Sequence, residues 1–182
     1  MLISRIVQLS ILWFLAGCFT ASAMAESRDP YTHFFNQTWG DFSEEVVAAR
    51  EQGKQGILFF FEMDECPFCH RMKTTVLNQP EVQAYFREHF LCFSIDVEGD
   101  VEIVDFEGNP TTQKEFASKA NRVRATPVFA FYDLQGKPVT RYTGATAGVE
   151  EFLWLGEYVA EGVYKHMRFT KFKRQKAEAA RQ

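Results

Sequence analysis

The residues that decide the fold run from Gly56 to His70 and read GILFFFEMDECPFCH. Residues 57–61 form an unbroken apolar run, which is typical of a strand buried on both faces and predicts a sheet covered by helices on both sides. Beyond this run, Cys69, Met72 and Val76 recur at helical spacing. The two cysteines of the stretch therefore lie where a strand ends and a helix begins.

Helices and strands are predicted to alternate along the rest of the chain. Apolar residues at helical spacing predict helices at 41–50, after Pro80, at 112–120 with Phe116 and Ala120 inward, and at 149–163. Apolar runs predict strands at 90–97, 128–132 and 138–142, the last two joined as a hairpin, and residues 98–112 indicate a hairpin-like insertion or a loop. This order predicts an α/β fold with a mixed central sheet flanked by helices.

The cysteine pair is placed for thiol chemistry. At a helix N-terminus, the sulfur of Cys66 meets unpaired N–H groups and the positive end of the helix dipole, and both favour the thiolate. Pro67 suits the first helical position because its missing N–H removes no helix bond there. With Pro67 and Phe68 between them, Cys66 is the predicted nucleophile and Cys69 the resolving cysteine of disulfide exchange.

The order strand, C-x-x-C, helix and, much later, Thr126-Pro127 before a strand resembles the thioredoxin superfamily over roughly residues 40–163. The resemblance implies a thioredoxin-like fold in which Pro127 is cis and lies against the disulfide, while the Thr126 backbone binds an extended substrate. The motif C-P-x-C-H-x-M, here Cys66 through Met72, and the ending at 151–159 are similar to SoxW-type periplasmic thioredoxin-like proteins.

The chain departs from thioredoxins proper at Phe60, which stands where those proteins carry a buried Asp before the first cysteine. The usual proton-relay carboxylate is therefore missing. Glu62 and His70 are the candidates for proton handling or for tuning the thiolate. A purely structural interpretation stays open for both, with Glu62 solvating a loop and His70 exposed on its helix.

Other uses of the cysteines are weaker. A structural disulfide would suit an exported protein, and C-x-x-C-H at 66–70 also fits a c-type haem attachment sequence. Haem c proteins, however, lack a buried strand before the motif and a Thr-Pro strand start downstream. No metal site is predicted, because only Cys92 and scattered histidines could complete four zinc ligands. Cys92 itself is predicted to be a buried apolar residue within a strand.

The N-terminus carries a predicted targeting segment, and the C-terminus is basic. Residues 1–25 have Arg5, an apolar run and a small-residue end, which predicts a secretory signal peptide. A second interpretation is a lipobox ending at residue 17, with Cys18 lipidated as a membrane anchor. Residues 26–164 are the predicted domain and hold 12 basic and 23 acidic residues. The tail at 165–182 holds 7 basic and 1 acidic residue and is predicted to be a solvated helix extension or a contact for anionic lipid or a partner.

Together these features predict a periplasmic thiol-disulfide oxidoreductase without cofactor beyond its redox-active disulfide. No nucleic-acid partner is expected, because no basic face interleaved with aromatics runs through the domain. We expect a reductase of protein disulfides, and the resemblance implies electrons from a membrane thiol transporter of the DsbD or CcdA kind. The alternatives are an oxidase or isomerase of the DsbA or DsbG type and a non-catalytic peptide-binding module.

Overall fold

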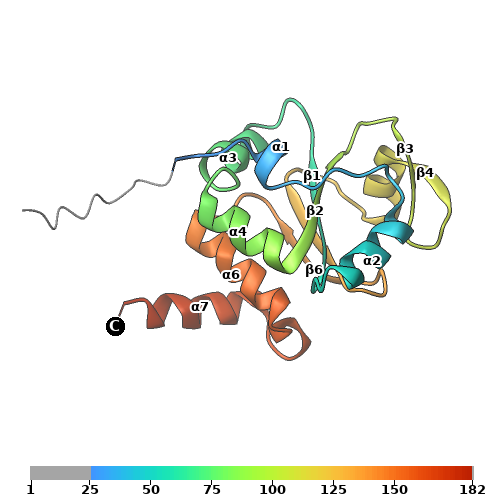
Figure 1. Ribbon diagram of the computed structural model, residues 1–182. Coiled ribbons are helices and arrows are strands. Elements are labelled where there is room, and N and C mark those ends of the chain that lie inside the picture. Colours follow the sequence, from blue (N-terminus) through green and yellow to red (C-terminus); the bar gives the residue numbers. More distant parts are fainter. Residues whose placement is uncertain (1–25, 182) are drawn as a thin grey trace, which may run out of the picture.

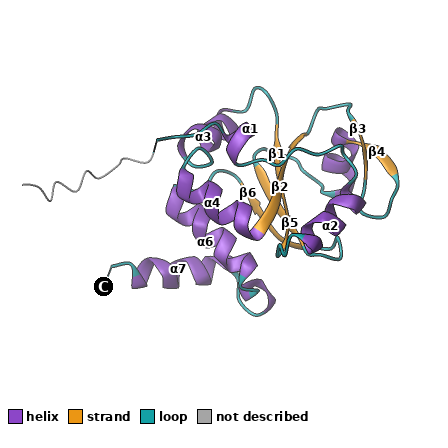
Figure 2. Cartoon of the chain, viewed as in Figure 1, coloured by secondary structure: helices purple, strands orange, loops and turns teal. Residues whose placement is uncertain are grey.

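A computed structural model describes residues 26–181. Its main sheet has the strand order β2-β1-β5-β6, with β1 at Gly56–Glu62, β2 at Phe90–Asp96, β5 at Val128–Tyr132 and β6 at Pro138–Thr143. β1 pairs in parallel with β2 and antiparallel with β5, and β5 pairs antiparallel with β6. The sheet is therefore mixed, with helices around it (Figures 1 and 2), and the predicted fold class is confirmed.

The helices divide between the two faces of this sheet. One face packs against α1, α3, α4 and α6, and the other packs against α2 and a π-helical segment. The bounds are α1 Pro30–His33, α2 Phe42–Glu51, α3 Pro67–Thr75, α4 Pro80–His89, α5 Gln113–Glu115, the π-helix Phe116–Ala120, α6 Val149–Ala160 and α7 Phe169–Ala179.

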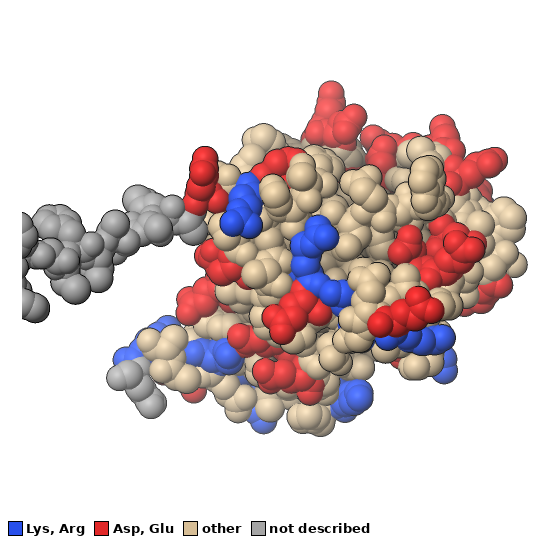
Figure 3. All heavy atoms as spheres, in the orientation of Figure 1, with Lys and Arg blue, Asp and Glu red and all other residues tan. Residues whose placement is uncertain are grey.

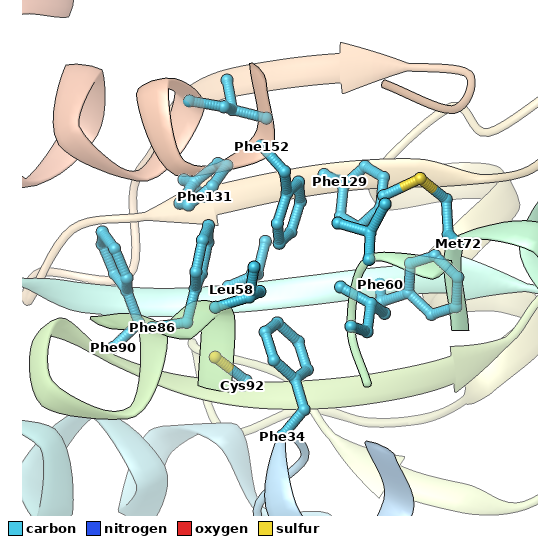
Figure 4. Close-up of a cluster of buried hydrophobic side chains, with 14 of the residues drawn as sticks. Phe34, Leu58, Phe60, Met72, Phe86, Phe90, Cys92, Phe129, Phe131 and Phe152 are labelled. Atoms are coloured by element: carbon cyan, nitrogen blue, oxygen red, sulfur yellow. The ribbon is translucent and has the colours of Figure 1, made fainter. Parts of the chain in front are cut away.

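β1 is the centre of the core, as its apolar run predicts. All its residues from Ile57 to Phe61 are fully buried. Leu58 and Phe60 point to the face covered by α1, α3, α4 and α6, where Figure 4 shows them among other aromatic rings. Phe59 and Phe61 point to the opposite face and join the cluster around α2. The alternation follows from the strand period of two, so burial of both faces needs an apolar residue at every position.

The segment between β2 and α5, predicted as a hairpin-like insertion or a loop, is a hairpin. β3 at Glu102–Val104 pairs antiparallel with β4 at Pro110–Thr112. Asp105 shapes the turn, because its carboxylate accepts the Asn109 backbone N–H at 2.8 Å. The Val104 N–H donates to the Gly40 carbonyl at 2.8 Å, which ties the hairpin to the segment before α2. Carboxylate side chains gather over this end of the molecule (Figure 3).

One inward residue of the helix at 112–120 differs from the prediction. Phe116 is buried, but Ala120 is exposed and Ala117 is buried instead. Residues Phe116–Ala120 form a π-helical turn, closed by the Asn121 N–H on the Phe116 carbonyl at 3.0 Å. A π-turn bonds residues five apart, so the four-residue spacing of a regular α-helix does not assign its buried side.

The basic tail folds back instead of extending into solvent. After Gly162, which has a φ of 69°, and a short 3-10 turn at Val163–Lys165, α7 runs along α6 (Figure 1). The ring of Tyr158 on α6 lies 5.3 Å from Phe169 and 5.7 Å from Phe172, measured between ring centroids. Ion pairs join the two helices, Lys173 with Glu151 at 2.8 Å and Lys176 with Glu157 at 2.6 Å.

Two predictions concern segments outside this description. The signal peptide at 1–25 and lipidation of Cys18 lie outside the described residues. Among residues 26–181, no helix is both long and apolar enough to cross a membrane.

Candidate active site

The site is built where β1 ends and α3 begins. Residues 63–65 form a short turn, and Cys66 follows as the N-cap of α3 with an extended backbone. Pro67 occupies the first helical turn, where its fixed φ is already helical and no donor is lost. The Cys69 N–H donates to the Cys66 sulfur at 3.0 Å. The strand-to-helix junction therefore aims a helix N-terminus at this sulfur.

Cys66 and Cys69 are joined by a disulfide, with their Cα atoms 5.2 Å apart. Cys66 is 6% exposed and Cys69 is 1% exposed, so an approaching thiolate meets the Cys66 sulfur first. The Cys69 N–H and the helix dipole act on the same sulfur and would stabilise it as a thiolate after reduction. This geometry suits a nucleophile at 66 and a shielded resolving thiol at 69.

The Thr126–Pro127 segment lies at the same end of the sheet. The register pairs Phe61 near the end of β1 with Val128 at the start of β5, so residues 126–127 sit beside the turn that leads to Cys66. The Thr126–Pro127 bond is cis, and Pro127 is buried. Thr126 is half-buried, and its backbone N–H and carbonyl bond no other backbone group within residues 26–181. They are thus available to an incoming extended chain.

A second loop, residues 144–148, is held against α3 by contacts that sequence reasoning missed. Arg71 donates to the Thr146 carbonyl at 2.9 Å. Thr146 is fully buried, and its hydroxyl lies 3.7 Å from the Met72 sulfur and 3.0 Å from the Gly148 carbonyl. A polar residue in a Gly- and Ala-rich loop has no periodic pattern, so the sequence carries no signal for this buried role.

Glu62 lies at the end of β1 and is held by three donors. It is 7% exposed and accepts from the Lys73 ammonium at 2.5 Å, the Ser94 hydroxyl at 2.6 Å and the Tyr31 hydroxyl at 3.1 Å. Burial raises the pKa of Tyr31, although Lys73 opposes the shift. Lys73 balances the charge of the Glu62 carboxylate, and the cluster links α1, α3 and β2, which sequence reasoning did not predict. The candidate role of Glu62 in proton handling stays a prediction.

The other residues around the motif face solvent. Phe68 is 57% exposed, and Asp64, Glu65 and His70 are also exposed. At the position of the missing carboxylate, the Phe60 ring packs 5.0 Å from the Phe129 ring, measured between centroids. Phe68 thus offers an exposed apolar contact next to the disulfide. Phe60 places an apolar ring where thioredoxins proper carry the buried carboxylate.

Cys92 lies in the middle of β2 and is fully buried. Burial raises the pKa of its thiol above the ordinary value. A protonated, enclosed thiol is a poor nucleophile, which agrees with the predicted packing role.

The mixed sheet with helices on both faces, and a C-x-x-C disulfide at a helix N-terminus beside a cis-proline, define a thioredoxin-fold domain. A family model described as a thioredoxin-like domain matches residues 42–160. The chain therefore belongs to the thioredoxin-like domain family.

Solved structures show the same fold at low sequence identity. A thioredoxin-fold protein from Helicobacter pylori is 20% identical with a TM-score of 0.58, over 75% of this chain and 99% of that chain. A thioredoxin from Thermus thermophilus is 24% identical with a TM-score of 0.54, over 75% and 98%. A DsbH oxidoreductase is 18% identical with a TM-score of 0.53, over 76% and 92%. No curated protein matches the chain.

Proposed function

We propose that this protein is a thiol-disulfide oxidoreductase that uses Cys66 as nucleophile and Cys69 as resolving thiol. The observation that carries the proposal is the sulfur of Cys66, which caps α3, accepts the Cys69 N–H at 3.0 Å and is disulfide-bonded to Cys69. The nearby cis Thr126–Pro127 bond, with the unbonded Thr126 backbone, supports a substrate platform beside it. Membership of the thioredoxin-like family supports the same chemistry.

In the reducing direction the exchange takes two steps. The Cys66 thiolate attacks one sulfur of a substrate disulfide, which forms a mixed disulfide and releases the other substrate sulfur as a thiolate. The Cys69 thiolate then attacks the Cys66 sulfur, which closes the Cys66–Cys69 disulfide and releases the second substrate thiolate. Two electrons pass from the protein dithiol to the substrate, and solvent supplies the protons that the product thiolates take up.

We infer the reducing direction from the charges around Cys66. Asp64 and Glu65 precede it directly, and both are exposed carboxylates. Negative charges close to a thiolate raise its free energy and oppose the helix dipole. A dithiol whose thiolate is less stabilised gives up electrons more readily, so these residues favour a low reduction potential.

The periplasm is the proposed location, on the strength of the signal-peptide pattern at 1–25. There the oxidised protein needs a dithiol donor for each turnover, and the resemblance to SoxW-type proteins points to a membrane thiol transporter of the DsbD or CcdA kind. Lipidation at Cys18 would keep the domain beside such a donor, whereas cleavage after residue 25 would release it.

The first experiment is the reduction potential of the Cys66–Cys69 couple in the purified protein, measured by thiol trapping across defined dithiothreitol and glutathione ratios. A value near about −270 mV would support the reductase, whereas about −120 mV would make the protein an oxidant and overturn the direction. The C-x-x-C-H alternative needs the same two sulfurs for haem, so a Soret band in the purified protein would contradict the redox assignment.

Single cysteine variants separate the enzyme from a binding module. Cys69→Ser should trap a mixed disulfide with substrate at Cys66, because no resolving thiol remains, whereas Cys66→Ser should trap none and lose turnover. Cys92→Ser is the matched control, since Cys92 is buried in β2. If Cys66→Ser reduced a protein disulfide at the wild-type rate, the oxidoreductase assignment would be wrong.

A further inference from the structure

The loop at residues 144–148 is bonded to both parts of the proposed site. At its start, the Gly144 N–H donates to the carbonyl of the cis-proline, Pro127, at 2.8 Å. Further along, Arg71 on α3 donates to the Thr146 carbonyl at 2.9 Å. The loop therefore joins the substrate platform to the helix that carries the two cysteines, and a shift of the loop would move one relative to the other.

Glu151 holds this loop from a third side. It lies in the first turn of α6, is 7% exposed, and its Oε2 accepts the Ala147 N–H at 3.0 Å. Its Oε1 accepts the Tyr142 hydroxyl at 3.1 Å and the Lys173 ammonium at 2.8 Å. Lys173 is the only cation paired with this carboxylate among residues 26–181. An enclosed carboxylate that loses its cation takes up a proton or turns toward water, and either change weakens its bond to the loop.

Lys173 belongs to α7, a helix outside the part of the chain that defines the family. The family model ends at residue 160, and α7 begins at residue 169 and lies beside α6 (Figure 1). A second ion pair also joins the two helices, Lys176 with Glu157 at 2.6 Å. Within the described chain, Glu157 has no hydrogen bond to the loop, whereas Glu151 does. One of the two ion pairs therefore reaches the site, and the other only docks α7.

We propose that Lys173 and Glu151 are positioning residues for disulfide exchange, through which α7 holds the loop at 144–148 and, with it, the Thr126–Pro127 platform. This inference rests on the proposed oxidoreductase function and assigns the basic tail a part in binding the substrate. Neither residue is bonded to a cysteine, so the chemistry at the sulfurs stays the same when the pair is removed. The effect should fall on substrates that lie along the platform as an extended chain, and a small disulfide should not sense it.

The test compares Lys173→Met with the wild type on a polypeptide disulfide and on a small neutral disulfide. The reduced protein is mixed with insulin or with bis(2-hydroxyethyl) disulfide, and closure of the Cys66–Cys69 disulfide is followed by thiol trapping. The second-order rate constant with insulin should fall about three- to tenfold, as expected when one hydrogen bond that holds the loop is weakened. The rate constant with the small disulfide and the reduction potential should stay unchanged.

Two further variants separate positioning from stability. Lys176→Met removes the other ion pair between α6 and α7 and should react with insulin at the wild-type rate. Lys173→Arg keeps a cation beside Glu151 and should restore most of the insulin rate. Thermal unfolding of each variant shows that it is folded at the assay temperature.

Several results would overturn the positioning role while the oxidoreductase assignment stands. These are a wild-type insulin rate in Lys173→Met, an equal loss in Lys176→Met, and an equal slowing of Lys173→Met with both disulfides. If the wild type exchanged with neither disulfide, the proposed function itself would fail. Hydrogen exchange of the Ala147 amide then tests the loop without any turnover: it should be faster in Lys173→Met than in Lys176→Met, and equal exchange would overturn the inference.

Discussion

Replacing Lys73 by Met tests whether the Glu62 cluster holds the strand end beneath the disulfide. Lys73 is the only cation bonded to Glu62 in the described chain, at 2.5 Å, and the two side chains are 21% and 9% exposed. Exposed ion pairs contribute about 0.2–1 kcal/mol, whereas breaking a fully buried pair costs about 3–5 kcal/mol. Since this pair is mostly enclosed, we expect Lys73→Met to lower the free energy of unfolding by about 2–3 kcal/mol.

The assay is urea unfolding of the oxidised protein, with Glu62→Gln and the double variant completing a cycle. The loss corresponds to a melting temperature roughly 4–12 °C lower in a domain of this size. The double variant should be less destabilised than the sum of the two single variants, because the unpaired buried carboxylate is gone. A loss below about 0.5 kcal/mol, or strict additivity, would refute the reasoning.

The difference in free energy of unfolding between wild type and Lys73→Met should depend on pH in a definite direction. Burial alone would lower the pKa of Lys73, but its hydrogen bonds to Glu62 and Tyr31 raise it above the ordinary value. A raised folded pKa gives stabilisation that is fully present below the unfolded value, about 10.4, and is lost as the pH rises through the folded value. The gap between wild type and Lys73→Met should therefore stay constant from pH 7 to about 9 and narrow above about pH 10.

Three further predictions concern other parts of the fold. Gly156→Ala would place a Cβ 2.9 Å from the Phe86 ring, so we expect the free energy of unfolding in urea to fall by about 1–3 kcal/mol. An unchanged free energy of unfolding would show that α4 and α6 can move apart at no cost. Burial alone would raise the pKa of Glu151, but Lys173 helps hold it below the ordinary value. This depressed pKa gives stability that is present above about pH 4.3 and is lost as the pH falls through the folded pKa. Lys173→Met should therefore make the free energy of unfolding fall less steeply at acid pH. If the free energy of unfolding of the variant fell as steeply as that of the wild type, the Lys173–Glu151 pair would not be the cause. Cys92 is fully buried, so the reduced native protein lacking residues 1–25 should react with only two equivalents of Ellman's reagent, through attack by Cys66 and resolution by Cys69, and a third thiol should react only after unfolding.

Much of the fold follows from local patterns in the chain. The apolar run at 57–61, the turn residues at 98–112 and the Asp133–Lys137 turn each predict an element that the structure contains. The position of Cys66 at a strand-to-helix junction also follows from neighbouring residues alone. Such features are readable because strand and helix periods depend on residues a few positions apart.

The rest depends on contacts between distant segments. Tyr31 and Ser94 both donate to Glu62, although 63 positions separate them in the sequence. Isolated polar residues follow no helix or strand period, so the sequence does not predict this contact. The turn at 116–120 buries Ala117 in place of Ala120 because its backbone departs from the regular helix period.

The sequence by itself determined the buried strand, the cysteine pair and the order of elements, because these rest on short-range spacing. Only the tertiary structure decided that α7 returns to α6 through Lys173 and Glu151, and that Tyr31, Lys73 and Ser94 converge on Glu62. The physical reason is that long polar side chains find their partners only after the apolar faces have packed, and that packing sets which distant residues come within bonding distance.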